Sequence, residues 1–211
     1  MKVTIERARI MLSLNGNYMN SEILKDTSIT SPVGILSDEE YRVLIYFTSV
    51  GSGKIYQYYK AHSNAEVKDL LDLFDKILQK LGKVQSRIVY RMDTYEAYMD
   101  NDEYIKIFKE YQANNTCLQI PWALSVSMKN WNKTYPQHPV WEIELLPNNS
   151  KAHPIYPYLE EDKILQEQES EVRFESNTIL KIVSVSKQDD FPYIKMKEVQ
   201  RNHISGNIKS L

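Results

Sequence analysis

The chain has little of several residue types, and each shortage excludes a class of protein. Cys117 is the only cysteine among 211 residues, so the chain forms no intramolecular disulfide and no cluster of thiolate metal ligands. Six glycines and eight prolines leave no long flexible linker, and the sequence holds no repeat or low-complexity tract. The four histidines are scattered without the spacing of metal ligands, so we expect no bound metal ion.

Neither charge nor hydropathy directs the chain to a nucleic acid or a membrane. The formal net charge is −2, which creates no global field that attracts polyanions or anionic lipid. No apolar run is long enough to span a bilayer, and charged residues interrupt the first seven positions, where a signal peptide needs an apolar core. We therefore expect no signal peptide, no transmembrane segment and a cytoplasmic protein, in the cell that makes it or in a host cell. With 42% hydrophobic and 26% charged residues, the chain can bury a core.

The order of the predicted elements indicates an α+β fold, with helices first and strands later. Ser37 precedes three acidic residues, which predicts a helix that starts with a capping box. A second helix is predicted over 64–81 because its apolar residues recur at helical spacing. The remaining pattern predicts a helix at 100–111, an irregular loop at 151–168, and strands at 88–90, 117–128, 140–146, 169–186 and 193–199.

Three short polar groups are candidates for chemistry. If Glu169 and Glu171 lie in an extended run, their side chains share one face about 7 Å apart. Such a pair can stabilise a developing charge with one carboxylate and orient or deprotonate a nucleophile with the other. Upstream, Arg91 ends an apolar stretch, and Ser125 and Ser127 flank a valine. Each group also has a simpler interpretation: a strand-end salt bridge, half-exposed serines and a solvated acidic edge.

In this order, Arg, Ser-x-Ser and Glu-x-Glu resemble the mono-ADP-ribosyltransferases that share the same three motifs, among them bacterial toxins, phage enzymes and vertebrate ecto-enzymes. The likeness covers roughly residues 36–199, including the helix over 64–81 and the strand and turn over 141–152. We assign residues 1–35 to an N-terminal extension and 200–211 to a C-terminal tail. The resemblance implies N-terminal helices followed by two roughly perpendicular antiparallel sheets, which form a cleft for NAD.

The resemblance also implies a reaction, in which ADP-ribose passes from NAD to an acceptor and nicotinamide leaves. Glu171 would stabilise the oxocarbenium-like ribose, and Glu169 would orient or deprotonate the acceptor. A Glu at the first position goes with arginine as the acceptor. Ser125 would hold Glu171 by a hydrogen bond. An NAD glycohydrolase, with water as acceptor, and a non-catalytic binding module on the same fold stay open as alternatives.

Other residues receive roles from the same resemblance. Arg91 would bind the NAD pyrophosphate, and Ser127 would help to close the strand pair beside the cofactor. In the loop after Ser127, Trp131 or Tyr135 would stack on nicotinamide. In the loop before Glu169, Tyr156 or Tyr158 would contact the acceptor.

The partner implied is a target protein in a bacterial or host cytoplasm, modified by a phage or toxin-like effector. A nucleic acid acceptor stays open, although the balanced charge gives it no support. The chain also departs from the family pattern, with Met92 where glycine is usual, Val126 between the serines, and Arg173 where an apolar residue is usual.

Overall fold

The computed structural model describes residues 25–32, 34–48, 65–93, 100–130, 138–159 and 170–211. The chain divides into two compact units. The N-terminal unit comprises residues 1–82 and 157–162, and the sheet unit comprises residues 83–156 and 163–211. The boundaries that we expect near residues 35 and 199 stay predictions.

The N-terminal unit contains two described helices, and both were predicted. Helix α3 (Asp38–Tyr46) begins as expected: the Ser37 hydroxyl accepts the Glu40 N–H, and the Glu40 carboxylate accepts the Ser37 N–H. Helix α5 (Ala65–Lys80) buries the apolar face that the spacing predicted, with Leu71, Phe74, Ile77 and Leu78, and Leu81 is buried just after it. No helix in the described part of the chain is both long and apolar enough to cross a membrane.

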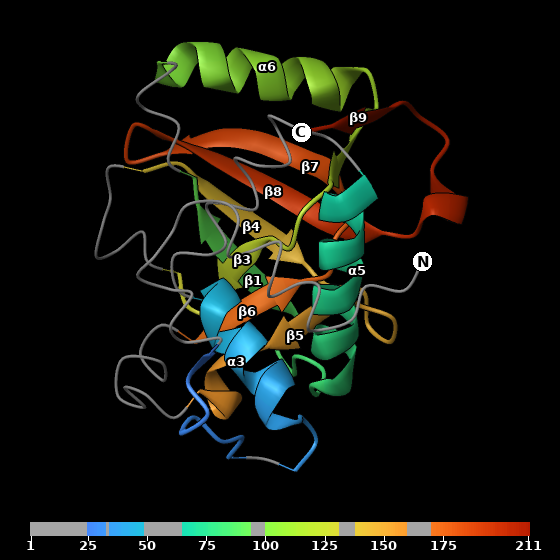
Figure 1. The fold of residues 1–211 in the computed structure, drawn as a ribbon. Coiled ribbons are helices and arrows are strands. Elements are labelled where there is room, and N and C mark those ends of the chain that lie inside the picture. Colours follow the sequence, from blue (N-terminus) through green and yellow to red (C-terminus); the bar gives the residue numbers. More distant parts are fainter. Residues whose placement is uncertain (1–24, 33, 49–64, 94–99, 131–137, 160–169) are drawn as a thin grey trace. The chain divides into compact units, whose positions relative to one another are not determined.

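The sheet unit is built on one nine-stranded sheet in the order β5-β6-β3-β1-β4-β8-β7-β2-β9 (Figure 1). Its strands are β1 (Ile88–Met92), β2 (Cys117–Ile120), β3 (Ser125–Ser127), β4 (Val140–Glu144), β5 (Ala152–Pro154), β6 (Glu171–Phe174), β7 (Thr178–Gln188), β8 (Phe191–Val199) and β9 (Ile208–Ser210). Helix α6 (Asn101–Ala113) lies across β7 and β8. The helices and mixed sheet agree with the α+β expectation. The separation into two perpendicular antiparallel sheets is not confirmed, because the ladder is continuous and the pairs β4/β8 and β2/β9 are parallel.

Two predicted segments need correction. Residues 117–128 were expected to form one strand, but they form β2 and β3, which pair with different neighbours. Pro121 lies between them and lacks the N–H that a continuous ladder would need. Residues 151–168 were expected to be irregular, yet they contain β5 and the 3₁₀ helix η3 (Tyr156–Tyr158). At the other end, the 3₁₀ helix η4 (Arg201–His203) and β9 occupy the segment that we assigned to a tail.

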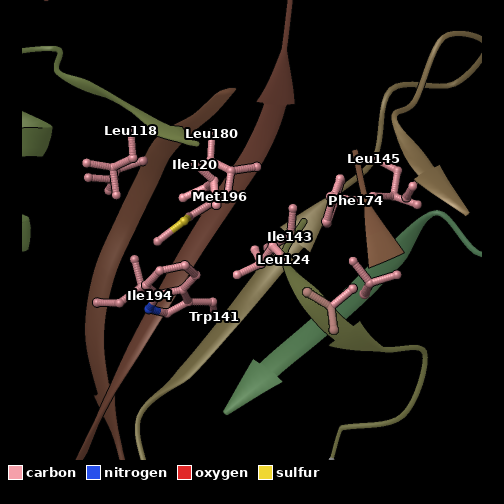
Figure 2. Packing of buried hydrophobic residues seen from close by; sticks show 14 of the residues in the cluster. Leu118, Ile120, Leu124, Trp141, Ile143, Leu145, Phe174, Leu180, Ile194 and Met196 are labelled. Atoms are coloured by element: carbon pink, nitrogen blue, oxygen red, sulfur yellow. The ribbon is translucent and has the colours of Figure 1, made fainter. Parts of the chain in front are cut away.

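One face of the sheet forms the core of the sheet unit. Apolar side chains from β1, β2, β3, β4, β6, β7 and β8 meet there, and Figure 2 shows Trp141, Ile143, Phe174, Ile194 and Met196 among them. Since side chains alternate along a strand, the neighbours of these residues point to the opposite face. A slip of one residue would exchange the two faces, so burial of this core fixes which side chains of β3 and β6 face away from it.

Candidate active site

Strands β3 and β6 place the predicted serine and glutamate side by side on the face opposite the core. Ser127 pairs with Glu171 across the ladder, and Ser125 pairs with Arg173. Ser125 Oγ donates a hydrogen bond of 2.9 Å to Glu171 Oε1. The N–H of Ile155 donates to the main-chain oxygen of Glu171 at 3.0 Å, so β6 is held from both sides at this residue. The core residues Val126 and Val172 lie between the polar ones and set this orientation.

Arg173 is a second partner of Glu171 that the sequence analysis missed. Its Nε lies 2.8 Å from Glu171 Oε1, the oxygen that also accepts from Ser125. The residue is 4% exposed. Burial lowers the pKa of Arg173, the carboxylate of Glu171 raises it, and the nearby charge of Arg91 lowers it further. A signal was present, because residues 171 and 173 share a face in any extended strand.

The segment just before β6 differs from the expectation. We expected residues 169–171 to be extended, but Ser170 has φ of 49°, in the left-handed region. A non-glycine residue there costs about 1 kcal/mol, and such strain concentrates at functional sites. Strand β6 therefore begins only at Glu171. The alternation of side chains along a strand does not assign Glu169 to the same face as Glu171. Glu169 itself lies outside the described residues, so its position stays a prediction.

Ser127 is held by its own turn. It is 9% exposed, and its Oγ accepts the N–H of Lys129 at 3.0 Å. The N–H of Met128 donates to the carbonyl oxygen of Ser170 at 3.1 Å. The Met128 contact joins the end of β3 to the start of β6. The closing role expected of Ser127 itself stays a prediction.

Arg91 lies on β1, on the face of the sheet opposite to that of Glu171. It pairs with the core residue Trp141, whereas its neighbour Tyr90 pairs with Ser127. The guanidinium of Arg91 lies 5.9 Å from the Trp141 ring centroid, and Nη1 donates to the main-chain oxygen of Ser125 at 2.9 Å. Arg91 is therefore connected to Glu171 through Ser125 and not by direct contact.

A partly buried chain of hydrogen bonds supports Arg91 from α6. Trp141 Nε1 donates to the Tyr104 hydroxyl at 2.6 Å, and that hydroxyl donates to Asp93 Oδ2 at 2.7 Å. The other oxygen of Asp93 lies 3.8 Å from Arg91 Nε. The side chain of Arg91 remains 27% exposed, so a positive charge held in place is still accessible to an anionic ligand such as a phosphate. No sequence signal pointed to Tyr104, because its helix precedes the partner strand by many residues.

Of the remaining predicted residues, the structure describes Tyr156 and Tyr158. The Tyr158 hydroxyl accepts the N–H of Gly82 at 3.0 Å within the N-terminal unit, and Tyr156 is half-buried in the sheet unit. Trp131 and Tyr135 lie outside the described residues. Within the described ranges, no three His, Cys, Asp or Glu side chains converge as metal ligands.

Comparison with known proteins shows what the chain resembles. No protein-family model and no curated protein matches the sequence. Among solved structures, the ADP-ribosyltransferase Vis of Vibrio splendidus in complex with agmatine is 15% identical, with a TM-score of 0.59 over 100% of this chain and 94% of its own. The Clostridium limosum C3 exoenzyme is 14% identical, with a TM-score of 0.58 over 94% and 96%. Exoenzyme S of Pseudomonas aeruginosa, bound to 14-3-3 protein beta and carba-NAD, is 12% identical, with a TM-score of 0.55 over 96% and 92%. The chain thus has the fold of the ADP-ribosyltransferases.

Proposed function

We propose that the chain transfers ADP-ribose from NAD to a protein acceptor and releases nicotinamide. The observation that carries the proposal is the hydrogen bond of 2.9 Å between Ser125 Oγ and Glu171 Oε1. It lies on the sheet face opposite the core, in a chain that has the fold of the ADP-ribosyltransferases. A carboxylate held in a fixed orientation is what cleavage of an N-glycosidic bond requires, because positive charge develops on the ribose.

Glu171 is the group that faces this charge. As the bond from ribose C1′ to the nicotinamide nitrogen breaks, its electron pair leaves with nicotinamide and the ribose becomes oxocarbenium-like. Both polar contacts of the Glu171 carboxylate within the described part of the chain use Oε1. The second oxygen, Oε2, is then the one that stabilises the ribose and accepts a hydrogen bond from a ribose hydroxyl.

We propose arginine as the acceptor, with Glu169 as the residue that orients it. A guanidinium is protonated at any working pH, so a carboxylate is needed to bind it and to take its proton as the new bond to C1′ forms. The complex of the similar protein Vis with agmatine, which carries a guanidinium group, supports an acceptor of this chemistry. Tyr156 or Tyr158 would contact that side chain.

The donor would be held by Arg91 at its pyrophosphate and by Trp131 or Tyr135 at its nicotinamide, with Ser127 closing the strand pair beside it. The carba-NAD complex of exoenzyme S supports NAD as the donor. We propose a target protein in the cytoplasm of a bacterium or of a host cell, which makes the chain a toxin-like or phage-like effector.

The test is incubation with NAD labelled in its adenylate, in a bacterial lysate. The wild type is compared with Glu171→Gln, Glu169→Gln and the control Glu144→Gln, in which the same change is made at an exposed carboxylate paired with Arg87. We expect label on protein with the wild type and the control, and its loss with Glu171→Gln. Sensitivity of the label to hydroxylamine would assign it to arginine.

Two outcomes would redirect the proposal. Nicotinamide release without labelled protein would make the enzyme a glycohydrolase, in which water takes the place of the acceptor. NAD binding without cleavage, in the presence of lysates from bacterial and animal cells, would identify a non-catalytic binding module. Labelled protein that persists with Glu171→Gln would refute the role of Glu171.

A further inference from the structure

We infer that Arg173 is a positioning residue for Glu171: together with Ser125 it holds Oε1, so that Oε2 faces the reacting ribose. This inference rests on the proposed function. Arg173 stands where an apolar residue is usual in the family that the chain resembles, and none of the three motifs of that family includes it. The claim therefore concerns a feature particular to this chain.

The geometry brings a hydroxyl donor and a guanidinium charge to one oxygen from different strands. Ser125 approaches from β3 with a distance of 2.9 Å, and Arg173 approaches from β6 itself with 2.8 Å. A single hydrogen bond leaves the carboxylate free to rotate about its terminal torsion, which is broad for glutamate. The buried charge of Arg173 against the same oxygen opposes that rotation and fixes where the other oxygen points.

Burial indicates that Arg173 has a specific role. The residue is 4% exposed, and removing a guanidinium from water is unfavourable unless a counter-charge and hydrogen bonds replace the solvent. The nearby charge of Arg91 adds repulsion. An apolar side chain of similar volume would fill the same space without these costs. A residue that works against folding stability beside a reactive carboxylate is what a functional site is expected to contain.

Loss of Arg173 should slow the chemical step and leave the binding of NAD nearly unchanged. Donor affinity would depend on Arg91 and on the residues that contact nicotinamide. Loss of Arg173 would instead allow Oε2 to leave its position, and a misplacement of about 1 Å is enough to reduce the rate substantially. The expected effect therefore falls on kcat and not on the KM for NAD.

The experiment compares Arg173→Met, Arg173→Lys and the control Arg87→Met, which removes an exposed guanidinium paired with Glu144. For each protein we would measure nicotinamide release, the KM for NAD and the unfolding midpoint. We expect Arg173→Met to lower kcat at least about tenfold with KM within about threefold, and Arg173→Lys to recover most of the loss, since it keeps a charged donor. The control should match the wild type.

A second readout does not depend on turnover. In ¹⁵N-labelled protein, the side-chain Nε–H resonance of Arg173 should be resolved and slow to exchange, and Glu171→Gln should shift it and speed its exchange. Absence of this dependence overturns the inference whatever the activity. An unchanged kcat for Arg173→Met overturns it too, as does a Lys variant as slow as the Met variant.

Failure of the proposed function gives a different result. A wild type that shows the Arg173 resonance but cleaves no NAD, with or without lysate, refutes the transferase and, with it, the positioning role. Arg173 would then be a structural partner of Glu171 only. A slow Arg173→Met variant beside an active wild type supports both statements.

Discussion

Replacing Glu171 by Gln should destabilise the sheet unit as well as remove activity. The substitution keeps the shape of the side chain but deletes the negative charge that faces Arg173 at 2.8 Å. The guanidinium cannot lose its own proton near neutral pH and cannot reach water, because only 5% of its side chain is exposed. The variant would therefore keep a buried positive charge that has lost the carboxylate beside it.

The magnitude follows from the burial of both partners. Breaking a buried ion pair by removing one charge costs about 3–5 kcal/mol, and we expect about 3 because 12% of the Glu171 side chain remains exposed. For a chain of this length, each kcal/mol lowers Tm by about 2–4 °C, so the expected decrease is roughly 6–12 °C.

Tryptophan fluorescence during urea unfolding is a suitable assay. All three tryptophans, at positions 122, 131 and 141, belong to the sheet unit that contains the pair. The signal therefore reports on the unit that the substitution affects, even if the N-terminal unit unfolds separately. The free energy of unfolding is obtained by linear extrapolation at a pH near 7.

The double variant Glu171→Gln/Arg173→Met tests the reasoning. It removes both charges, so it should regain most of the lost stability, whereas two independent losses would add. Glu144→Gln, at an exposed pair with side chains 77% and 44% exposed, should change the free energy of unfolding by less than about 1 kcal/mol. Equal stability of Glu171→Gln and the wild type would refute the coupling of the two residues, as would a double variant no more stable than the single one.

Three further predictions concern the fold. Glu198 is 3% exposed and accepts hydrogen bonds from two main-chain N–H groups of the turn between β4 and β5, at 3.1 and 2.7 Å. Glu198→Gln should lower the free energy of unfolding by about 2–3 kcal/mol in the same urea assay, and a decrease below about 1 kcal/mol would contradict this prediction. Ser37→Ala removes the α3 cap and should cost about 1 kcal/mol, seen as faster hydrogen exchange within α3. Burial and the contact with Glu142 raise the pKa of Tyr193. Above about pH 10 the unfolded chain loses this proton first, so stability should fall as pH rises, and less steeply in Tyr193→Phe.

Local patterns predicted local structure well. The capping box at Ser37 and the apolar spacing over 64–81 depend only on residues within a few positions, and both helices are present. Alternation along β3 and β6 likewise accounts for the shared face of Ser125 and Glu171, because a buried core fixes the register.

Non-local pairing was not predictable in the same way. Strand β5 has three residues and exists because β6 offers it a ladder, so its own sequence carries almost no strand signal. The support of Arg91 by Tyr104 depends on α6 packing against the sheet, which no short-range pattern encodes. The left-handed conformation of Ser170 is held by its surroundings and is not favoured by its residue type.

Arg173 changes how the loss of activity in a Glu171 variant should be interpreted. From the sequence alone, Arg173 is only a departure from a family pattern, and the obvious test of Glu171 is the single variant Glu171→Gln. The structure couples the two residues, so that variant changes a charge at the ribose and also removes the carboxylate that lies 2.8 Å from a buried guanidinium. Its inactivity would not distinguish lost chemistry from a distorted sheet. Glu171→Gln/Arg173→Met keeps the site electrically balanced, and Arg173→Met alone shows how much activity the loss of Arg173 removes. Complete inactivity in a stable double variant that still binds NAD, beside residual activity in Arg173→Met, is the result that assigns the chemical step to Glu171.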